Sequence, residues 1–250
     1  MRITEASHDR QTHRRGRGAG DPELMTLKAH RLITGASVIA YPAPDTGESF
    51  ARSIAADFIP AGTTEIPIVV PMRSERFPAQ EVYDGAARAI AGHLDAGRDV
   101  VVLCEGDPFF YGSFMYLFER LADRYPSEIV PGVTSMTACA AALRRPLAAR
   151  NDQLSVIPAT LPESALRARL ASCDAAAIIK LGRHLPKVRG ILHELGLTES
   201  AGYVERATLD TQKAGRLSDI APDAAPYFSM ILIYKGDEPW SLELTQQSSS

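Results

Sequence analysis

Cysteine is scarce in this chain, and neither its cysteines nor its histidines show the spacing of metal ligands. The three cysteines, Cys104, Cys139 and Cys173, lie far apart in apolar or alanine-rich surroundings. A disulfide framework or a zinc site needs closely spaced cysteines or Cys/His pairs, and no CxxC motif occurs. The six histidines form no HExxH pattern. We therefore expect reduced, buried cysteines and no metal site.

Long apolar runs and a surplus of basic residues are also lacking. No run approaches the ~18 apolar residues that a membrane span requires, and the polar N-terminal residues lack the apolar segment of a secretory signal. The formal net charge is -3, whereas nucleic-acid binders usually carry a basic surplus. We expect a cytoplasmic protein with no membrane or nucleic-acid partner.

Two phosphate-binding fingerprints are missing as well, because there is no GxxxxGK(S/T) loop and no GxGxxG at a strand–helix junction. What remains is the composition of an ordinary globular protein, with 45% hydrophobic and 23% charged residues. At 250 residues the chain can bury a substantial core in one large or two smaller domains.

The most informative stretch present runs from Val100 to Ser113. Residues 100–103 are continuously apolar, which is typical of a strand buried on both faces of a parallel sheet. An acidic turn, residues 105–108, interrupts the run, and helical spacing follows over residues 114–121. Ligands bind at the carboxyl ends of such strands in open α/β sheets, so a site is expected here.

Each residue of this turn suits a ligand-binding loop. Gly106 has no Cβ, so that a ligand can approach the backbone, and Pro108 stiffens the turn. Asp107 offers a carboxylate that can accept from a hydroxyl or an ammonium group. A plain turn with a capping Asp is the alternative interpretation.

Strands and helices alternate to about residue 145, which predicts an α/β domain with parallel pairing, and the second half repeats the alternation with different spacing. Strands are expected at 37–41, 66–70, 100–103, 128–130, 154–157, 175–181, 202–208 and 227–234. Helices are expected at 21–34, with Asp21 as N-cap, and at 49–58, 78–94, 114–121, 136–143, 163–170 and 185–195.

Composition divides the chain into four parts. Residues 1–17 are a polar arm expected to be disordered; its Arg14, Arg15 and Arg17 could touch nucleic acid, but a solvated arm is favoured. Two α/β domains follow, at 18–145 and 146–238, with the ligand cleft between them, and residues 239–250 form a polar tail.

At this point the chain resembles the tetrapyrrole methyltransferases of the cobalamin pathway. Within them it is most similar to the group that methylates precorrin-2. The stretches that carry the resemblance are GAGDPELMTLKA (18–29), CEGDPFFYGSFMYLFERL (104–121), VPGVTSMTACAAAL (130–143) and IIKLGRHLPKVRGIL (178–192).

The resemblance implies an S-adenosylmethionine-dependent enzyme, a homodimer, with its cofactor folded in the interdomain cleft and no metal. The substrate would be precorrin-2, a reduced tetrapyrrole, methylated on carbon 20, the bridging carbon between rings A and D, to give precorrin-3A. The implied cofactor-binding residues are Glu105, Gly106, Asp107, Tyr111, Thr134, Ser135, Leu181, Tyr203, Ser229 and Met230. For Leu181, a place in the core is an equally good interpretation.

Chemistry suggests what the remaining residues do. Methyl transfer from a sulfonium is an in-line displacement that depends mostly on positioning. His184 is the candidate base for the bridging proton, and Tyr111 and Glu105 are weaker ones; a packing or surface histidine is the alternative. Because arginine binds carboxylates bidentately, the substrate's carboxylates make candidates of the arginines near strand ends or the domain junction: Arg144, Arg145, Arg150, Arg183 and Arg206. Asp21 is a further candidate for substrate binding.

One departure from the family and three alternatives complete the expectations. Family members begin with an apolar strand in the middle of the first sheet, but residues 12–17 here read THRRGR, and Ala19 replaces a proline. Either a charged segment takes that place or the sheet is incomplete there. The alternatives are a methylase of the same fold acting on cobalt-precorrin-2, one acting on another ring position, and a non-catalytic protein that binds S-adenosylmethionine or tetrapyrrole.

Overall fold

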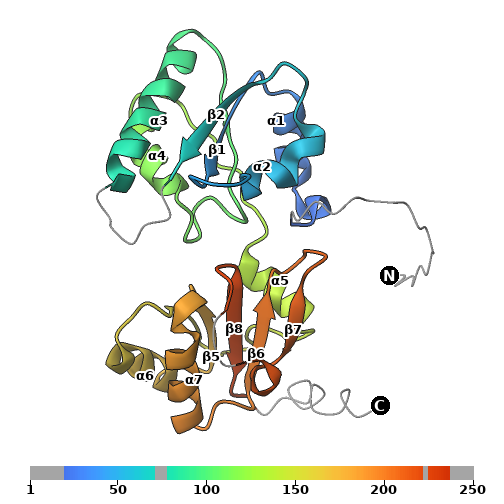
Figure 1. Cartoon of the computed structure of the whole chain (residues 1–250), viewed down its shortest axis with the longest axis vertical. Coiled ribbons are helices and arrows are strands. Elements are labelled where there is room, and N and C mark those ends of the chain that lie inside the picture. Colours follow the sequence, from blue (N-terminus) through green and yellow to red (C-terminus); the bar gives the residue numbers. More distant parts are fainter. Residues whose placement is uncertain (1–19, 71–77, 222–224, 237–250) are drawn as a thin grey trace, which may run out of the picture.

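The computed structural model describes residues 20–70, 78–221 and 225–236. The predicted arm, with Arg14, Arg15 and Arg17, and the predicted tail lie outside these residues. Figure 1 shows two lobes, each built of a sheet with helices, joined by an extended stretch that precedes helix α5. The α/β class is therefore confirmed.

The first lobe contains a parallel sheet with the strand order β2-β1-β3. In its register, Ala40 of β1 lies opposite Ile66 of β2 and Val102 of β3. The strands are β1 (Val38–Ala43), β2 (Thr64–Val69) and β3 (Val101–Val102). The helices are α1 (Leu27–Thr34), α2 (Phe50–Ala55), α3 (Pro78–Asp95) and α4 (Phe114–Leu121), with 3-10 turns η1 (Pro22–Leu24) and η2 (Ala56–Phe58).

Helices cover both faces of this sheet because the apolar side chains of its strands alternate in direction. Ala40 packs in one cluster with Ile90 of α3 and Leu117 of α4. Its neighbour Ile39 packs in another cluster with Ile33 of α1 and residues of α2. The helices predicted at 78–94 and 114–121 are thus confirmed within a residue or so at their ends.

Three expectations for this lobe are wrong. Strand β3 has only two paired residues, and both are half-buried rather than buried on both faces. Residues 128–130 form no strand. Both differences have one cause: among the described residues, β1 is the sole neighbour of β3, so nothing extends the ladder toward 128–130. The third error concerns Asp21, which caps the short turn η1, while α1 begins at Leu27.

The second lobe contains a mixed sheet with the order β4-β5-β8-β6-β7. Only β4 and β5 pair in parallel, and the other described pairs are antiparallel. Its strands are β4 (Leu154–Pro158), β5 (Ala175–Ile179), β6 (Ala201–Glu205), β7 (Lys213–Arg216) and β8 (Ser229–Tyr234). Its helices are α5 (Ser135–Ala142), α6 (Glu163–Ala171) and α7 (Leu185–Glu194), with 3-10 turns η3 (Gly182–His184) and η4 (Leu217–Asp219).

Strand β7 was not predicted, because its sequence, KAGR, has neither an alternation of apolar and polar residues nor β-branched residues. It is defined by pairing with β6 instead, for example Gly202 opposite Arg216. Strand β5, in contrast, is an apolar run that is buried along its whole length.

The core of the second lobe surrounds β5 and β8. Helices α6 and α7 cover one face through residues such as Leu166 and Leu192. Helix α5 covers the other, where Leu143, just beyond its end, shares a cluster with Met230 and Leu232. Although the predicted first domain extends to residue 145, α5 packs on the second sheet.

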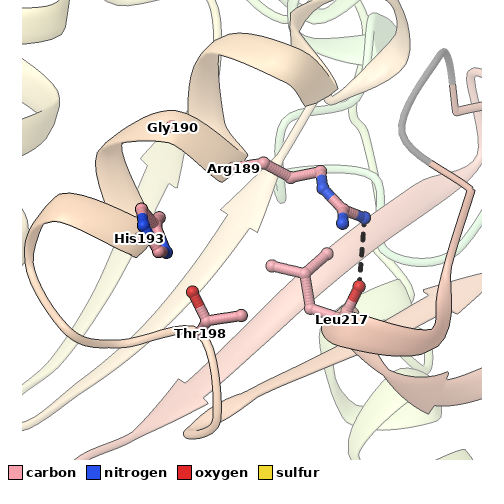
Figure 2. A pocket seen from close by; sticks show the side chains of 5 residues that line it. All are labelled: Arg189, Gly190, His193, Thr198 and Leu217. Atoms are coloured by element: carbon pink, nitrogen blue, oxygen red, sulfur yellow. Dashed lines mark hydrogen bonds between the residues drawn. The ribbon is translucent and has the colours of Figure 1, made fainter.

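A pocket of about 320 Å³ lies against α7 and is formed by the second lobe alone. Arg189 donates from Nη1 to the carbonyl of Leu217 at 3.0 Å (Figure 2). The same nitrogen donates to the carbonyl of Ile220 at 2.7 Å, so both of its bonds serve the fold. Within the described residues, no helix is long and apolar enough to cross a membrane, and no cluster of three metal-ligating side chains occurs.

Candidate active site

Four of the six described non-glycine residues with positive φ lie beyond the carboxyl ends of strands β3, β5 and β6. Tyr111 lies in the loop after β3, Lys180 directly follows β5, and Arg206 and Thr208 follow β6. Their φ angles are 56°, 58°, 51° and 70°, in the left-handed region that side chains with a Cβ disfavour. Such conformations persist where the surroundings enforce them and cluster at functional sites, so the candidate site lies at these strand ends.

The loop after β3 meets the turn before α5 at a contact that only glycines permit. A Cβ added at Gly132 would lie 2.1 Å from the carbonyl oxygen of Gly106, and one at Gly106 would lie 3.3 Å from that of Val133. Gly106 also has a φ of 69°. The structure therefore brings together two stretches, around Gly106 and around Thr134, that the sequence singled out separately.

Asp107 holds these two stretches together. Its Oδ2 accepts from the backbone N–H of Gly132 at 3.0 Å, and its Oδ1 accepts from that of Phe109 at 2.9 Å. The sequence suggested a carboxylate at the mouth of the site, able to accept from a ligand. Both oxygens instead have partners within the chain, so in this structure Asp107 shapes the loop.

Thr134 and Ser135 lie at the start of helix α5. Thr134 is the N-cap, and its hydroxyl accepts from the N–H of Thr137 at 3.3 Å. The N–H nitrogen of Ser135 lies 3.8 Å from the position that a Cβ would take on Gly106. Backbone donors and the helix dipole favour a negative group here, such as a carboxylate.

Glu105 is half-buried between the loop after β3 and helix α2. Burial raises the pKa of its carboxyl, and hydrogen bonds from its own N–H and that of Ala51 offset only part of this effect. The raised pKa makes Glu105 a better proton acceptor than an exposed carboxylate would be.

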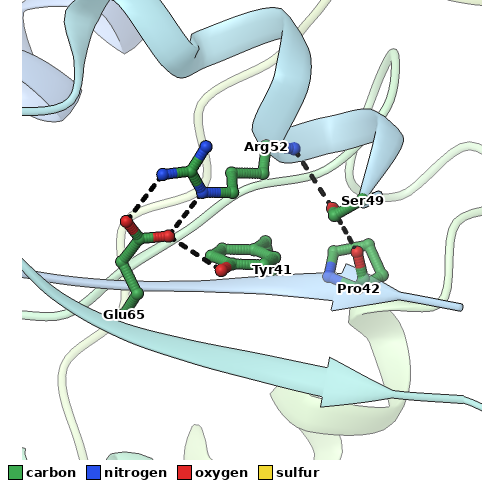
Figure 3. A network of polar contacts seen from close by, with 5 residues as sticks. All are labelled: Tyr41, Pro42, Ser49, Arg52 and Glu65. Carbon is green, nitrogen blue, oxygen red and sulfur yellow. Dashed lines mark hydrogen bonds and ion pairs between the residues drawn. The ribbon is translucent and has the colours of Figure 1, made fainter. Parts of the chain in front are cut away.

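Helix α2 is fixed next to Glu105 by polar contacts (Figure 3). Ser49 caps the helix by accepting from the N–H of Arg52 at 3.2 Å. The Arg52 guanidinium donates to both oxygens of Glu65 on β2, and the hydroxyl of Tyr41 on β1 donates to Glu65 at 2.7 Å. The second lobe also reaches α2, since the rings of Phe50 and Phe228 lie 4.7 Å apart.

Four residues expected to line the cofactor pocket, Ser229 and Met230 through their backbone, have buried side chains. Leu181 and Tyr203 are 0% and 1% exposed and belong to the core beneath α6 and α7. Met230 packs with α5, and Ser229 donates its hydroxyl to the carbonyl of Pro226 at 2.7 Å. For Leu181 the structure therefore matches the alternative interpretation, a place in the core.

Sequence reasoning missed Glu205, the buried carboxyl at the end of β6. The Tyr203 hydroxyl donates to it at 2.7 Å, and Lys213 and Arg206 lie 3.3 and 3.4 Å away. Burial alone would raise the pKa of Glu205, but hydrogen bonds from Tyr203 and Lys213 outweigh it, so the pKa lies below its ordinary value. The signal was an acidic residue at the end of an otherwise apolar strand.

The residues predicted to bind substrate are spread over the lobe junction and the second lobe. The backbone N–H of Asp21 donates to the Thr208 hydroxyl at 3.3 Å, which joins the two lobes. Arg144 and Arg150 are exposed between α5 and β4, Arg183 is exposed in η3, and Arg206 pairs with Glu205. Arg145 is a correction: it is 6% exposed and donates to the carbonyls of Ser200 and Tyr234, so its role is structural.

The two residues predicted as catalytic differ in their surroundings. His184 ends η3, and burial, followed by the charges of Lys187 and Arg183, lowers its pKa, so the neutral, proton-accepting form dominates at neutral pH. Tyr111 is 46% exposed, and its ring lies beneath the Lys180 ammonium group. The thiol of Cys104, which is half-buried rather than buried, has its pKa raised by burial to about 12.

Comparison with known families now gives the class of protein. The family model for tetrapyrrole (corrin/porphyrin) methylases matches residues 16–221. The chain therefore belongs to this family and is a methyltransferase. The family transfers methyl groups from S-adenosylmethionine.

Individual relatives agree with this assignment. A precorrin-2 C(20)-methyltransferase from a Sinorhizobium species is 41% identical over 226 residues, 87% of this chain and 92% of the relative. A cobalt-precorrin-2 C(20)-methyltransferase from Salmonella typhimurium is 31% identical, with 87% and 93% covered. The solved uroporphyrin-III C-methyltransferase from Thermus thermophilus, complexed with S-adenosyl homocysteine, is 25% identical, with 85% and 92% covered and a TM-score of 0.58.

Proposed function

We propose that this protein transfers a methyl group from S-adenosylmethionine to carbon 20 of precorrin-2, giving precorrin-3A in cobalamin biosynthesis. The observation that carries the proposal is the 41% identity to a precorrin-2 C(20)-methyltransferase over nearly the whole of both chains. The relative's reaction is thereby assigned to this chain. The cytoplasm is the proposed location.

The chain's own residues fit an S-adenosylmethionine site. Gly106 and Gly132 let two backbone loops meet where side chains with a Cβ would collide. Thr134 and Ser135 place a helix N-terminus there, suited to the carboxylate of the cofactor's methionine moiety. When bound, the cofactor supplies a sulfonium-activated methyl group. Leu181, Tyr203, Ser229 and Met230 shape the site from the core behind it, where their side chains are buried.

The contribution of the protein to the reaction is mostly orientation. A nucleophilic carbon held in line at ~3–3.5 Å needs little covalent help. His184, neutral because of its lowered pKa, is the proposed acceptor of the bridging proton. Glu105 is the second candidate, since burial raises its pKa. Arg144, Arg150, Arg183 and Arg206, with Asp21, are the proposed contacts to the carboxylate-bearing substrate.

A homodimer is part of the proposal. Among the described residues, several large apolar side chains remain exposed, including Leu27 at 90%, Phe109 at 48% and Tyr116 at 43%. Single exposed apolar residues are ordinary, but the Phe109 ring also contacts those of Phe114 and Phe118 on α4, and an apolar patch of this kind suits an interface. Sedimentation equilibrium should give twice the chain mass of 27.1 kDa; a monomer at micromolar concentration would overturn this part.

Turnover with alternative substrates tests the proposal. Radiolabelled S-adenosylmethionine would be supplied with precorrin-2, cobalt-precorrin-2 or uroporphyrinogen III under anaerobic conditions. We expect label to enter precorrin-2 fastest. The 31% identity to a cobalt-precorrin-2 enzyme makes the cobalt-loaded substrate the second candidate. Tight cofactor binding without transfer to any of the three would favour a non-catalytic binding protein.

A further inference from the structure

Lys180 is a charged residue at the candidate site; it lies in the stretch 178–192 that carries the family resemblance, but no role was assigned to it there. It follows β5, the fully buried strand, and so marks the point where that strand leaves the core. Its side chain is exposed, and its Nζ lies 5.8 Å from the ring centroid of Tyr111. Tyr111 belongs to the loop after β3, in the other lobe. The pair therefore places a positive charge where the two lobes face each other.

The backbone at Lys180 is in a conformation that a side chain makes costly. Its φ of 58° lies in the left-handed region, where glycine is favoured. Tyr111 has the same kind of backbone, with a φ of 56°. Two residues away from Lys180, the chain does use a glycine at positive φ, Gly182 at 41°. Strain of this kind is typical of functional positions, so the lysine side chain has a use that a glycine would not serve.

The ammonium group also lacks a charged partner in the part of the chain that the structure describes. The described ion pairs of lysine involve Lys28 and Lys213, whose partners are Glu128 and Glu205. Lys187 and Lys235 donate instead to backbone carbonyls. The contact of Lys180 is the face of an aromatic ring, which attracts a cation but leaves its N–H groups able to donate elsewhere.

We propose that Lys180 is a substrate-binding residue whose ammonium group, positioned over the Tyr111 ring, pairs with a peripheral carboxylate of the tetrapyrrole. This inference rests on the proposed function for the identity of the substrate. Tyr111 then acts through Lys180 as a positioning residue, in place of the catalytic role that the sequence suggested. Because the ring and the ammonium group belong to different lobes, the pair holds the positive charge at the junction of the lobes.

Direct binding of uroporphyrin, a fluorescent porphyrin polycarboxylate, tests the proposal without turnover. Lys180→Gln and Lys180→Gly should both weaken binding about tenfold, the size of one charge-assisted hydrogen bond. Lys180→Arg should retain most of the affinity. Lys180→Gly is decisive because glycine relieves the backbone strain, so the variant should be at least as stable as the wild type. Wild-type affinity in Lys180→Gly would overturn the proposal.

Two further measurements separate substrate binding from general damage. Calorimetric affinity for S-adenosylhomocysteine should be the same in every Lys180 variant; a parallel loss would overturn the proposal. With precorrin-2, KM should rise about tenfold while kcat changes little. Lys28→Gln, the same charge change on the outer helix α1, is the matched control and should leave porphyrin affinity unchanged.

The Tyr111 contact has its own test. Tyr111→Leu should weaken uroporphyrin binding, and Tyr111→Phe, which keeps the ring, should weaken it less. Equal affinities for the two variants would contradict the positioning role. If the wild type binds uroporphyrin through Lys180 but methylates no precorrin-2, the assigned reaction fails while the binding role stands. If precorrin-2 is methylated and Lys180→Gly has wild-type KM, the binding role of Lys180 fails while the assigned reaction stands.

Discussion

At the scale of single residues, the sequence predicts the loops of the site better than the side chains within them. A glycine in a loop can be recognised in the sequence as a possible site of close backbone approach, because other residues are excluded there. Gly106 and Gly132 meet as such a pair. Side-chain roles depend on partners distant in sequence. Asp107 accepts a hydrogen bond from Gly132, and Arg145 donates to Ser200 and Tyr234; none of these three partners is visible from local spacing.

Replacing Gly132 with alanine should damage the site at its tightest point. The new Cβ would lie 2.1 Å from the carbonyl oxygen of Gly106, so the two loops must separate. We expect a loss of about 1–3 kcal/mol in the free energy of unfolding and weaker binding of S-adenosylhomocysteine, measured by denaturant titration and calorimetry. Gly92→Ala is the control, because a Cβ at this position in the last turn of α3 meets nothing within 4 Å. It should stabilise the protein by up to ~1 kcal/mol. Equal effects of the two substitutions would contradict this account of the loop contact.

The lowered pKa of His184 leads to a pH prediction. Burial and the nearby charges of Lys187 and Arg183 disfavour its protonated form, so the neutral base persists below the ordinary value of 6.5. Because the unfolded chain protonates first, the contribution of His184 to stability is full at neutral pH and declines as pH falls below 6.5. If His184 is the base, His184→Gln should lower kcat about 10²-fold and remove the acidic limb of the kcat profile. A variant that keeps the acidic limb and loses only stability would identify a packing histidine.

At the scale of helices and strands, the periodicity of apolar residues predicted the helices that pack with one face on a sheet. It failed for strands whose existence depends on pairing with a neighbouring strand. Helices α3 and α4 have a clear apolar stripe and form where expected. Strand β7 has no such pattern and exists only through β6. The opposite error occurred at residues 128–130, where two apolar residues follow Glu128 and no strand neighbour is present among the described residues.

Helix α2 tests the link between an element and the site it supports. Arg52 and then Tyr41 lower the pKa of the Glu65 carboxyl by hydrogen bonding, against the opposing effect of burial. Glu65 therefore stabilises the fold above the ordinary pKa of 4.5, and this stabilisation is lost as pH falls through the lower, folded-state value. Glu65→Gln should cost ~1–2 kcal/mol at pH 7, measured by denaturant titration.

The difference between Glu65→Gln and the wild type should shrink in acid. The exposed Glu119→Gln on α4 is the matched control and should change stability by less than ~0.5 kcal/mol. A Glu65→Gln effect that is constant between pH 7 and pH 3 would show that packing rather than charge fixes α2.

At the scale of the whole molecule, the two-lobed α/β architecture follows from the alternation of strands and helices. The order and direction of the strands in each sheet do not follow from it. Mixed pairing in the second sheet depends on β8, the last strand, entering between β5 and β6. Such long-range order has no local signature. In the first sheet, β3 has one neighbour among the described residues, and the charged residues 12–17 contain no apolar run.

Location of the transferred methyl group is the most direct test of the central claim. The wild-type protein would receive S-adenosylmethionine with a ¹³C-labelled methyl group and metal-free precorrin-2 in a single turnover, and the product would be examined by NMR. The account predicts one new methyl resonance coupled to carbon 20. Label on any other carbon would contradict the assigned reaction, and so would bound cofactor with no transfer.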